Sequence, residues 1–274
     1  MEYPIVFCDY DGTIFDPVAQ QVPPRTREAI HAYRQAGGIF VLTTGRIYSS
    51  ILPRAQAIGV DTGYLVCLQG SVGYQIETGR QVFCHDLSAK DWHAVAAFVE
   101  AKGWICQFYH DTHFYVAYPN PYTEEYIDLC GVEPIFVGVP ASRWAQASDW
   151  TAHKMIVMTP PQEAEARIAT LKSAFPHLDV SQSAPKYIEV VAADSGKGNA
   201  VKALCRYLGI DVSRSVAFGD ATNDNSMLQA AGVGVAMDNA LLDTKAVADV
   251  ICPSVSACGV ASVLEDILAG KPIL

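Results

Sequence analysis

The stretch VFCDYDGTIFD, residues 6–16, places two acidic residues directly after an apolar run. The run Ile5–Cys8 is short and wholly apolar, which predicts a buried strand, and Asp9 and Asp11 follow it one residue apart. Two carboxylates that share a small space repel each other, and one of them takes up a proton unless a cation joins them. A buried strand that ends in this way predicts a functional site at its carboxyl end.

Further apolar runs, separated by helical periodicity, occur in the first and last thirds of the chain. They predict strands at residues 39–42, 64–68, 215–218 and 234–237. The helix after Pro23-Pro24 is expected to end at Gly37-Gly38, and a helix near residue 197 is expected to take Ser195 as its N-cap. Continuous apolar strands that alternate with helices are typical of a parallel sheet covered on both faces.

The middle of the chain has a different character, because it is richer in aromatic residues and its strands do not alternate with helices. Two amphipathic helices are predicted there, the first with Trp92 on its apolar stripe. This mixture describes an α+β module. We therefore expect a Rossmann-like parallel-sheet core formed by residues 1–82 and 191–274, with an α+β cap domain inserted at residues 83–190.

Composition excludes several classes of partner. The 274 residues carry a net charge of −10, which disfavours nucleic acid and anionic membrane surfaces. The first residues lack the pattern of a signal peptide, and no apolar stretch reaches the roughly 18 residues of a membrane span. Eight scattered cysteines are expected to be reduced. We therefore expect a cytoplasmic protein that is a monomer or a weak homo-oligomer.

The predicted strand ends collect residues with the chemistry of phosphoryl transfer. A hard dication such as Mg²⁺ binds carboxylates together with a phosphate, and Asp9 and Asp220 are candidate ligands. Asp9 is also a candidate nucleophile that would form an aspartyl-phosphate, and Asp11 a candidate general acid and base. Thr44 and Lys197 are expected to hold the phosphoryl oxygens.

Four short motifs in this order resemble the haloacid dehalogenase-like superfamily, and within it the Cof-type (IIB) sugar phosphatases. The resemblance spans essentially the whole chain. The motifs are D-x-D-G-T at residues 9–13, T-G-R at residues 44–46, the lysine of Lys197-Gly198, and G-D-x-x-N-D at residues 219–224.

The resemblance implies a role for each matching residue. Asp9 and Asp11 would be catalytic, and both would also bind Mg²⁺, Asp11 through its backbone carbonyl. The remaining implied metal ligands are Asp220 and Asp224, the latter supporting either the metal shell or the lysine. The implied substrate-binding residues are Thr44, Gly45, Lys197 and Asn223.

Two positions depart from the family pattern. Gln69-Gly70 stands where Asn-Gly is frequent, and Asp238-Asn239 stands where Gly-Asn is frequent. Arg46 is open to two interpretations, a ligand contact or a structural residue.

Polar residues of the predicted cap also have two interpretations each. A polar hairpin turn is preferred to a metal site for His110, Asp111, His113 and Tyr115. Solvated lysines are preferred to substrate contacts for Lys154 and Lys186.

The function expected from these features is a Mg²⁺-dependent phosphatase. It would hydrolyse small phosphorylated metabolites, sugar phosphates in particular, through an aspartyl-phosphate intermediate. The alternatives are a phosphomutase and a non-catalytic regulatory protein that binds phosphometabolites.

Overall fold

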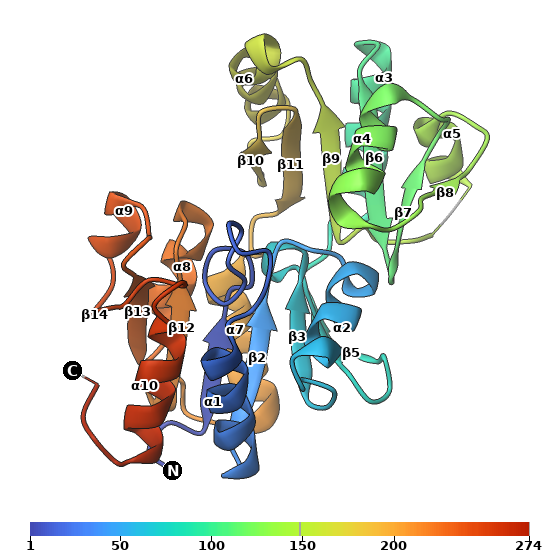
Figure 1. The fold of residues 1–274 in the computed structure, drawn as a ribbon. Coiled ribbons are helices and arrows are strands. Elements are labelled where there is room, and N and C mark those ends of the chain that lie inside the picture. The colour runs from blue at the N-terminus through green and yellow to red at the C-terminus, as the bar shows by residue number, and fades with distance from the viewer. Residues whose placement is uncertain (148, 274) are drawn as a thin grey trace. The chain divides into compact units, whose positions relative to one another are not determined.

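The structure is a computed structural model that describes residues 1–147 and 149–273, apart from the side chain of residue 129 (Figure 1). It separates into two compact units. The core unit comprises residues 1–83 and 196–274, and the inserted unit comprises residues 84–195. None of the helices in the described parts of the chain is both long and apolar enough to cross a lipid bilayer.

The core unit is built on a sheet whose strand order is β14-β13-β12-β1-β2-β3-β4-β5. Neighbouring strands from β14 to β3 are parallel, and β4 turns back antiparallel to β3. Both faces of β1 are buried, as its continuous apolar run predicts. The strands are β1 (Ile5–Cys8), β2 (Ile39–Thr43), β3 (Tyr64–Cys67), β4 (Val72–Gln75), β5 (Gln81–Cys84), β12 (Ser215–Gly219), β13 (Val233–Met237) and β14 (Val250–Cys252).

Helices cover this sheet on both sides, with α1 and α10 packed together in front of it and α7 behind it in the view of Figure 1. The helices are α1 (Pro24–Gln35), α2 (Tyr48–Ala57), α7 (Lys197–Leu208), α8 (Asn225–Ala230), α9 (Leu242–Lys245) and α10 (Gly259–Leu268). Three short 3-10 segments are η1 (Leu68–Gly70), η3 (Val212–Arg214) and η4 (Thr222–Asp224). The expected N-cap of α7 is wrong: the helix begins one residue later, behind Gly196, and no side chain caps it.

The inserted unit has its own mixed sheet, in the order β10-β11-β9-β6-β7-β8. All its pairings are antiparallel except that of β7 with β8. Its strands are β6 (Ile105–His110), β7 (His113–Val116), β8 (Ile135–Phe136), β9 (Lys154–Met158), β10 (Leu178–Ala184) and β11 (Tyr187–Ala192). Its helices are α3 (Ala89–Ala101), α4 (Pro121–Cys130), α5 (Ala141–Gln146) and α6 (Ala164–Ala174), with a 3-10 turn η2 (Pro161–Glu163).

The α/β class with an inserted mixed sheet is confirmed, and so are several local predictions. Trp92 lies in the apolar core of the inserted unit. The polar hairpin turn is present between β6 and β7, and Asp111 adopts a positive φ of 50° there.

One prediction about lysines is wrong. Lys154 is not solvated but almost fully buried, and its ammonium pairs with Glu189 at 2.9 Å. Lys186 does lie near the surface, where it pairs with Glu125. The two cases differ because every residue of β9 is buried, whereas Lys186 lies in the turn between β10 and β11.

Candidate active site

The candidate site lies at the carboxyl ends of β1, β2 and β12 in the core unit. Because β1 pairs in parallel with both β2 and β12, the residues that follow these strands emerge at one edge of the sheet. Asp9 follows β1, and its backbone N–H donates to the carbonyl of Phe218 at 3.0 Å. Thr44 follows β2 and Asp220 follows β12. The predicted meeting of polar residues at this edge is therefore present.

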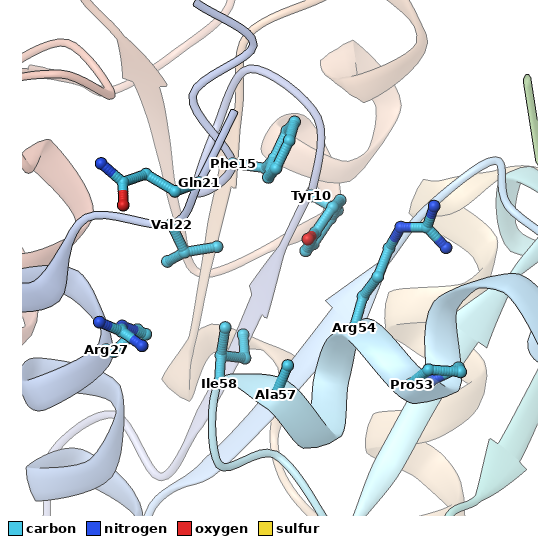
Figure 2. A pocket seen from close by; sticks show the side chains of 9 residues that line it. All are labelled: Tyr10, Phe15, Gln21, Val22, Arg27, Pro53, Arg54, Ala57 and Ile58. Carbon is cyan, nitrogen blue, oxygen red and sulfur yellow. The ribbon is translucent and has the colours of Figure 1, made fainter. Parts of the chain in front are cut away.

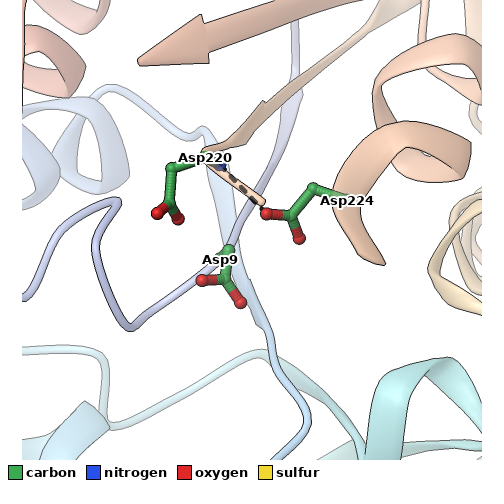
Figure 3. Close-up of side chains that lie close together, drawn as sticks. All are labelled: Asp9, Asp220 and Asp224. Carbon is green, nitrogen blue, oxygen red and sulfur yellow. Dashed lines mark hydrogen bonds between the residues drawn. The ribbon is translucent and has the colours of Figure 1, made fainter. Parts of the chain in front are cut away.

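Lys197 joins two of the acids. Its ammonium donates to Asp9 Oδ1 and to Asp224 Oδ1, both at 2.6 Å, and all three side chains are buried. Carboxylate oxygens of Asp9, Asp220 and Asp224 lie within 4.8 Å of one another, and Figure 3 shows the three side chains facing a common space. We refer to these three aspartates as the acidic cluster.

The acidic cluster carries more negative charge than Lys197 can balance. Burial raises the pKa of Asp9 to about 7, although the ammonium of Lys197 lowers it. Burial also raises the pKa of Asp220 to about 6, against the hydrogen bond from Thr13. Burial alone would lower the pKa of Lys197, but the carboxylates of Asp224 and Asp9 raise it. Burial is thus the main cause of both raised pKa values, and the neighbouring carboxylate of Asp224 adds to it.

Asp224 has both of its oxygens occupied by the protein. Oδ1 accepts from Lys197, and Oδ2 accepts from the backbone N–H groups of Asp220 at 3.0 Å and Ala221 at 3.1 Å. These bonds shape the loop after β12 and hold the lysine. The geometry therefore favours the second of the two roles considered for this residue, support of Lys197 and of the loop.

Asp220 is fixed from the opposite side by the loop after β1. Thr13 Oγ1 donates to Asp220 Oδ1 at 2.9 Å. Gly12 has a φ of +84°, and a Cβ atom at this position would lie 2.4 Å from Asp220 Oδ2. Glycine is therefore required here both for the backbone conformation and for the close approach of the carboxylate.

Asp11 does not join the acidic cluster. Its carboxylate is about half exposed and accepts two hydrogen bonds from Arg46, at 2.8 Å from Nε and 2.7 Å from Nη2. The hydrogen bond from Arg46 to Asp11 raises the pKa of the guanidinium. Of the two interpretations of Arg46, the structure supports a residue that holds Asp11.

The remaining predicted binding residues lie around the same edge. Thr44 is buried, and its hydroxyl accepts from the backbone N–H of Arg46 at 3.2 Å. Gly45 follows it. Asn223 is exposed on η4, where its amide nitrogen donates to Gln69 Oε1 at 3.0 Å.

Two residues of the site were not assigned a role from the sequence. Thr13 belongs to the D-x-D-G-T motif, so its position was visible, but its bond to Asp220 was not. Asn239 donates to the carbonyl of Gly12 at 2.8 Å and accepts from the backbone N–H of Val255 at 2.9 Å. It therefore ties the loop after β13 to the loop after β1, and the only sequence signal near it is the departure of the neighbouring Asp238 from the family pattern.

A pocket of about 510 Å³ lies elsewhere in the core unit, beside the segment between β1 and α1 (Figure 2). Among its lining residues only Tyr10 belongs to the first motif, and no member of the acidic cluster lines it. Its lining residues are Tyr10, Phe15, Gln21, Val22, Arg27, Pro53, Arg54, Ala57 and Ile58. The pocket is thus distinct from the candidate site.

The acidic cluster fits a hard divalent cation. Such an ion prefers oxygen ligands and balances excess negative charge, which is what this cluster presents. Asp220 Oδ2 and the second oxygen of Asp9 are the atoms best suited to it, since Lys197 and Thr13 take the other two oxygens.

Comparisons with known proteins agree with this geometry. The family model of haloacid dehalogenase-like hydrolases matches residues 6–264. The HMP-PP phosphatase of Serratia proteamaculans is 28% identical, with 89% of this chain and 86% of that protein covered.

Solved structures share the fold. TM0651 from Thermotoga maritima superposes with a TM-score of 0.86 at 22% identity, covering 96% of this chain and 97% of that one. The HAD subclass IIB sugar phosphatase BT4131 superposes with a TM-score of 0.79 at 24% identity, covering 96% and 98%. Since the family model spans nearly the whole chain, the protein belongs to the haloacid dehalogenase-like hydrolases.

Proposed function

We propose that this hydrolase is a Cof-type, subclass IIB phosphatase. We propose further that it is Mg²⁺-dependent, hydrolyses phosphorylated sugars, and works through an aspartyl-phosphate formed on Asp9. One observation carries the proposal: buried Asp9 is held by Lys197 beside Asp220, in a cluster with more carboxylates than cations. A site of this kind is complete only when a cation and an anionic phosphate enter together.

Mg²⁺ would be held by Asp9, Asp220 and the backbone carbonyl of Asp11. When bound, it supplies positive charge that offsets the repulsion between the carboxylates and the phosphate. Asp224 supports this arrangement indirectly by fixing Lys197 and the backbone at Asp220.

Asp9 provides the nucleophilic oxygen. A bond forms between its carboxylate oxygen and phosphorus, while the bond from phosphorus to the leaving alcohol breaks. Asp11, which takes up a proton from water when it leaves Arg46, donates that proton to the alcohol. A water then attacks phosphorus and gives a proton to Asp11, which releases inorganic phosphate and restores the carboxylate of Asp9.

Asp11 must leave Arg46 to perform these steps. In the structure its two oxygens accept hydrogen bonds from the guanidinium, an arrangement that suits the ionised carboxylate. We propose that substrate binding replaces this pairing and that Arg46 retains Asp11 between turnovers.

The phosphate would be held by Lys197, Thr44, Gly45 and Asn223. Lys197 is the first residue of α7, so the phosphate also lies where helix N–H groups and the helix dipole favour an anion. The inserted unit, with domain boundaries proposed at residues 83 and 190, would select among substrates. BT4131, a sugar phosphatase with the same fold, supports the choice of sugars.

The proposal is tested by release of inorganic phosphate from a panel of phosphate esters with Mg²⁺ or with EDTA. We expect sugar phosphates to give the highest kcat/KM and EDTA to abolish turnover. A phosphopeptide that exceeds every sugar phosphate, or full activity in EDTA, would overturn the proposal. Transfer of the phosphoryl group to a second sugar hydroxyl without release would identify a phosphomutase, and binding without either reaction would identify a regulatory protein.

A further inference from the structure

We propose that Gln69 is a positioning residue of the phosphate site, acting through Asn223 and Gly45. The inference rests on the proposed function, in which both of these residues contact the substrate phosphate. Gln69 belongs to η1, the short turn after β3, and its side chain is partly buried.

The side-chain amide of Gln69 spans two loops of the site. Its oxygen accepts the hydrogen bond from Asn223 Nδ2 at 3.0 Å. Its nitrogen covers Gly45 so closely that a Cβ atom on that glycine would lie 2.5 Å from it. One amide therefore links the loop after β12 to the loop after β2.

The backbone of Gln69 is held in the left-handed region, with φ 60° and ψ 26°. Two hydrogen bonds fix it there: Gln69 N–H donates to the carbonyl of Thr44 at 3.0 Å, and Leu68 N–H donates to the carbonyl of Arg46 at 3.1 Å. Glycine or asparagine adopts this conformation with less strain than glutamine. A strained glutamine whose side chain reaches two site loops indicates that the side chain is used.

Holding Asn223 matters because that residue is exposed and would otherwise sample several rotamers. Donation of one amide hydrogen to Gln69 fixes the plane of the Asn223 amide. The second amide hydrogen remains available to a phosphate oxygen. The side chain of glutamine is one methylene longer than that of asparagine, and this length lets its amide reach both loops.

Two substitutions of Gln69 separate the effect of side-chain length from the effect of side-chain charge. Gln69→Asn keeps an amide and suits the backbone but shortens the side chain. We expect KM for a sugar phosphate and the inhibition constant of inorganic phosphate to rise about tenfold, with kcat changed less than about threefold. Gln69→Glu keeps the length and the acceptor for Asn223 but adds negative charge, so both constants should rise by about thirtyfold or more.

Gln20 offers a matched control. It is also a glutamine with positive φ, 54°, in the core unit, and its side chain donates to the carbonyl of Pro17. Gln20→Asn should leave KM and the phosphate inhibition constant unchanged. An equal change in the Gln20 and Gln69 variants would assign the effect to backbone strain and would overturn the proposal.

A double-mutant cycle tests the route of action. If Gln69 acts through Asn223, then Gln69→Ala and Asn223→Ala should each raise the phosphate inhibition constant about tenfold, and the double variant should rise little further. Additive effects would overturn that route. Unchanged constants in all Gln69 variants, with Asn223→Ala impaired, would overturn only this inference. An enzyme inactive on every phosphate ester, or an active Asp9→Asn variant, would instead overturn the proposed function and with it this inference.

Discussion

The two units of this protein treat buried charge in opposite ways. In the core unit, the three aspartates of the acidic cluster share the ammonium of Lys197, and burial raises the pKa of both Asp9 and Asp220. In the inserted unit, Lys154 and Glu189 form a one-to-one pair at 2.9 Å, and the ring of Tyr109 lies 4.9 Å from the ammonium. Charge is in excess in the first region and balanced in the second.

This difference separates a site from a structural pair. Excess buried charge is unfavourable in the isolated protein, and it is relieved by proton uptake or by ligands of opposite sign. A balanced buried pair needs no ligand, but the loss of one partner leaves an uncompensated charge. Substitutions in the two regions should therefore affect activity and stability in opposite proportions.

The largest effect is expected for Asp9→Asn. Asparagine has nearly the same shape but cannot form the acyl-phosphate, so kcat should fall by about four orders of magnitude or more. Stability of the metal-free protein should be retained or increased, because one charge leaves a cluster that has too many. Phosphate release and urea unfolding measure the two quantities. If the folded Asp9→Asn variant turned over substrate at the wild-type rate, Asp9 would be excluded as the nucleophile.

The reverse pattern is expected for Glu189→Gln. It leaves the buried ammonium of Lys154 without a counter-charge, which should reduce the free energy of unfolding by about 3–5 kcal/mol. Since all four tryptophans, at residues 92, 104, 144 and 150, belong to the inserted unit, their fluorescence reports its unfolding.

The exposed pair Lys186–Glu125 is the matched control in the same unit. Glu125→Gln should change the unfolding midpoint little, because water solvates the remaining lysine. If both variants lose the same stability, burial is not what distinguishes the two pairs.

The pH dependence of stability should have opposite signs in the two units. Raised folded-state pKa values, about 7 for Asp9 and about 6 for Asp220, contribute stability at low pH that is lost as pH rises through them. In the inserted unit, burial raises the pKa of Asp86, but the hydrogen bonds from His153 and Thr151 and the charge of His153 together outweigh burial and lower the pKa overall. The contribution of Asp86 to stability is present above its pKa in the unfolded chain and is lost as pH falls below that pKa.

Urea unfolding in EDTA between about pH 2 and pH 8 checks these signs, since the contribution of Asp86 is lost only below its unfolded pKa of about 4. Circular dichroism follows both units, and tryptophan fluorescence follows the inserted one. We expect the alkaline loss of core stability to diminish when Mg²⁺ is added, since the cation replaces the proton among the carboxylates. If the free energy of unfolding of the core unit rose from pH 5 to 8 in EDTA, the acidic cluster could not hold the excess negative charge that we infer.

The sequence predicted the core better than the inserted unit, for a physical reason. Apolar runs reveal buried strands, and the rule that parallel strands end at one edge brings Asp9, Thr44 and Asp220 together without any tertiary knowledge. Lys154 was misjudged because its partner, Glu189, lies on another strand and is revealed only by the pairing of β9 with β11.

Side-chain orientation was also beyond the sequence. Asp11 stands one residue from Asp9, yet its carboxylate faces Arg46 rather than the acidic cluster. The spacing of a motif predicts the path of the backbone. The direction of each side chain depends on which charged or polar group it can pair with. The left-handed backbone of Gln69 is a further case, since glutamine is not a residue that signals this conformation.

The smallest effect is expected at Thr13, which holds a candidate metal ligand without belonging to the acidic cluster. Thr13→Val removes the hydroxyl that donates to Asp220 Oδ1 at 2.9 Å while keeping the shape of the side chain. The Mg²⁺ concentration for half-maximal activity should rise about tenfold, because the carboxylate loses the partner that orients it. At saturating Mg²⁺, kcat should stay within about threefold of the wild-type value, since Asp9 and Lys197 are untouched. Thr13→Ser restores a hydroxyl and should recover most of the lost Mg²⁺ affinity. A large fall in kcat with unchanged Mg²⁺ dependence would mean that Thr13 acts on the substrate. Thr13 would then not be the residue that orients Asp220 for metal binding.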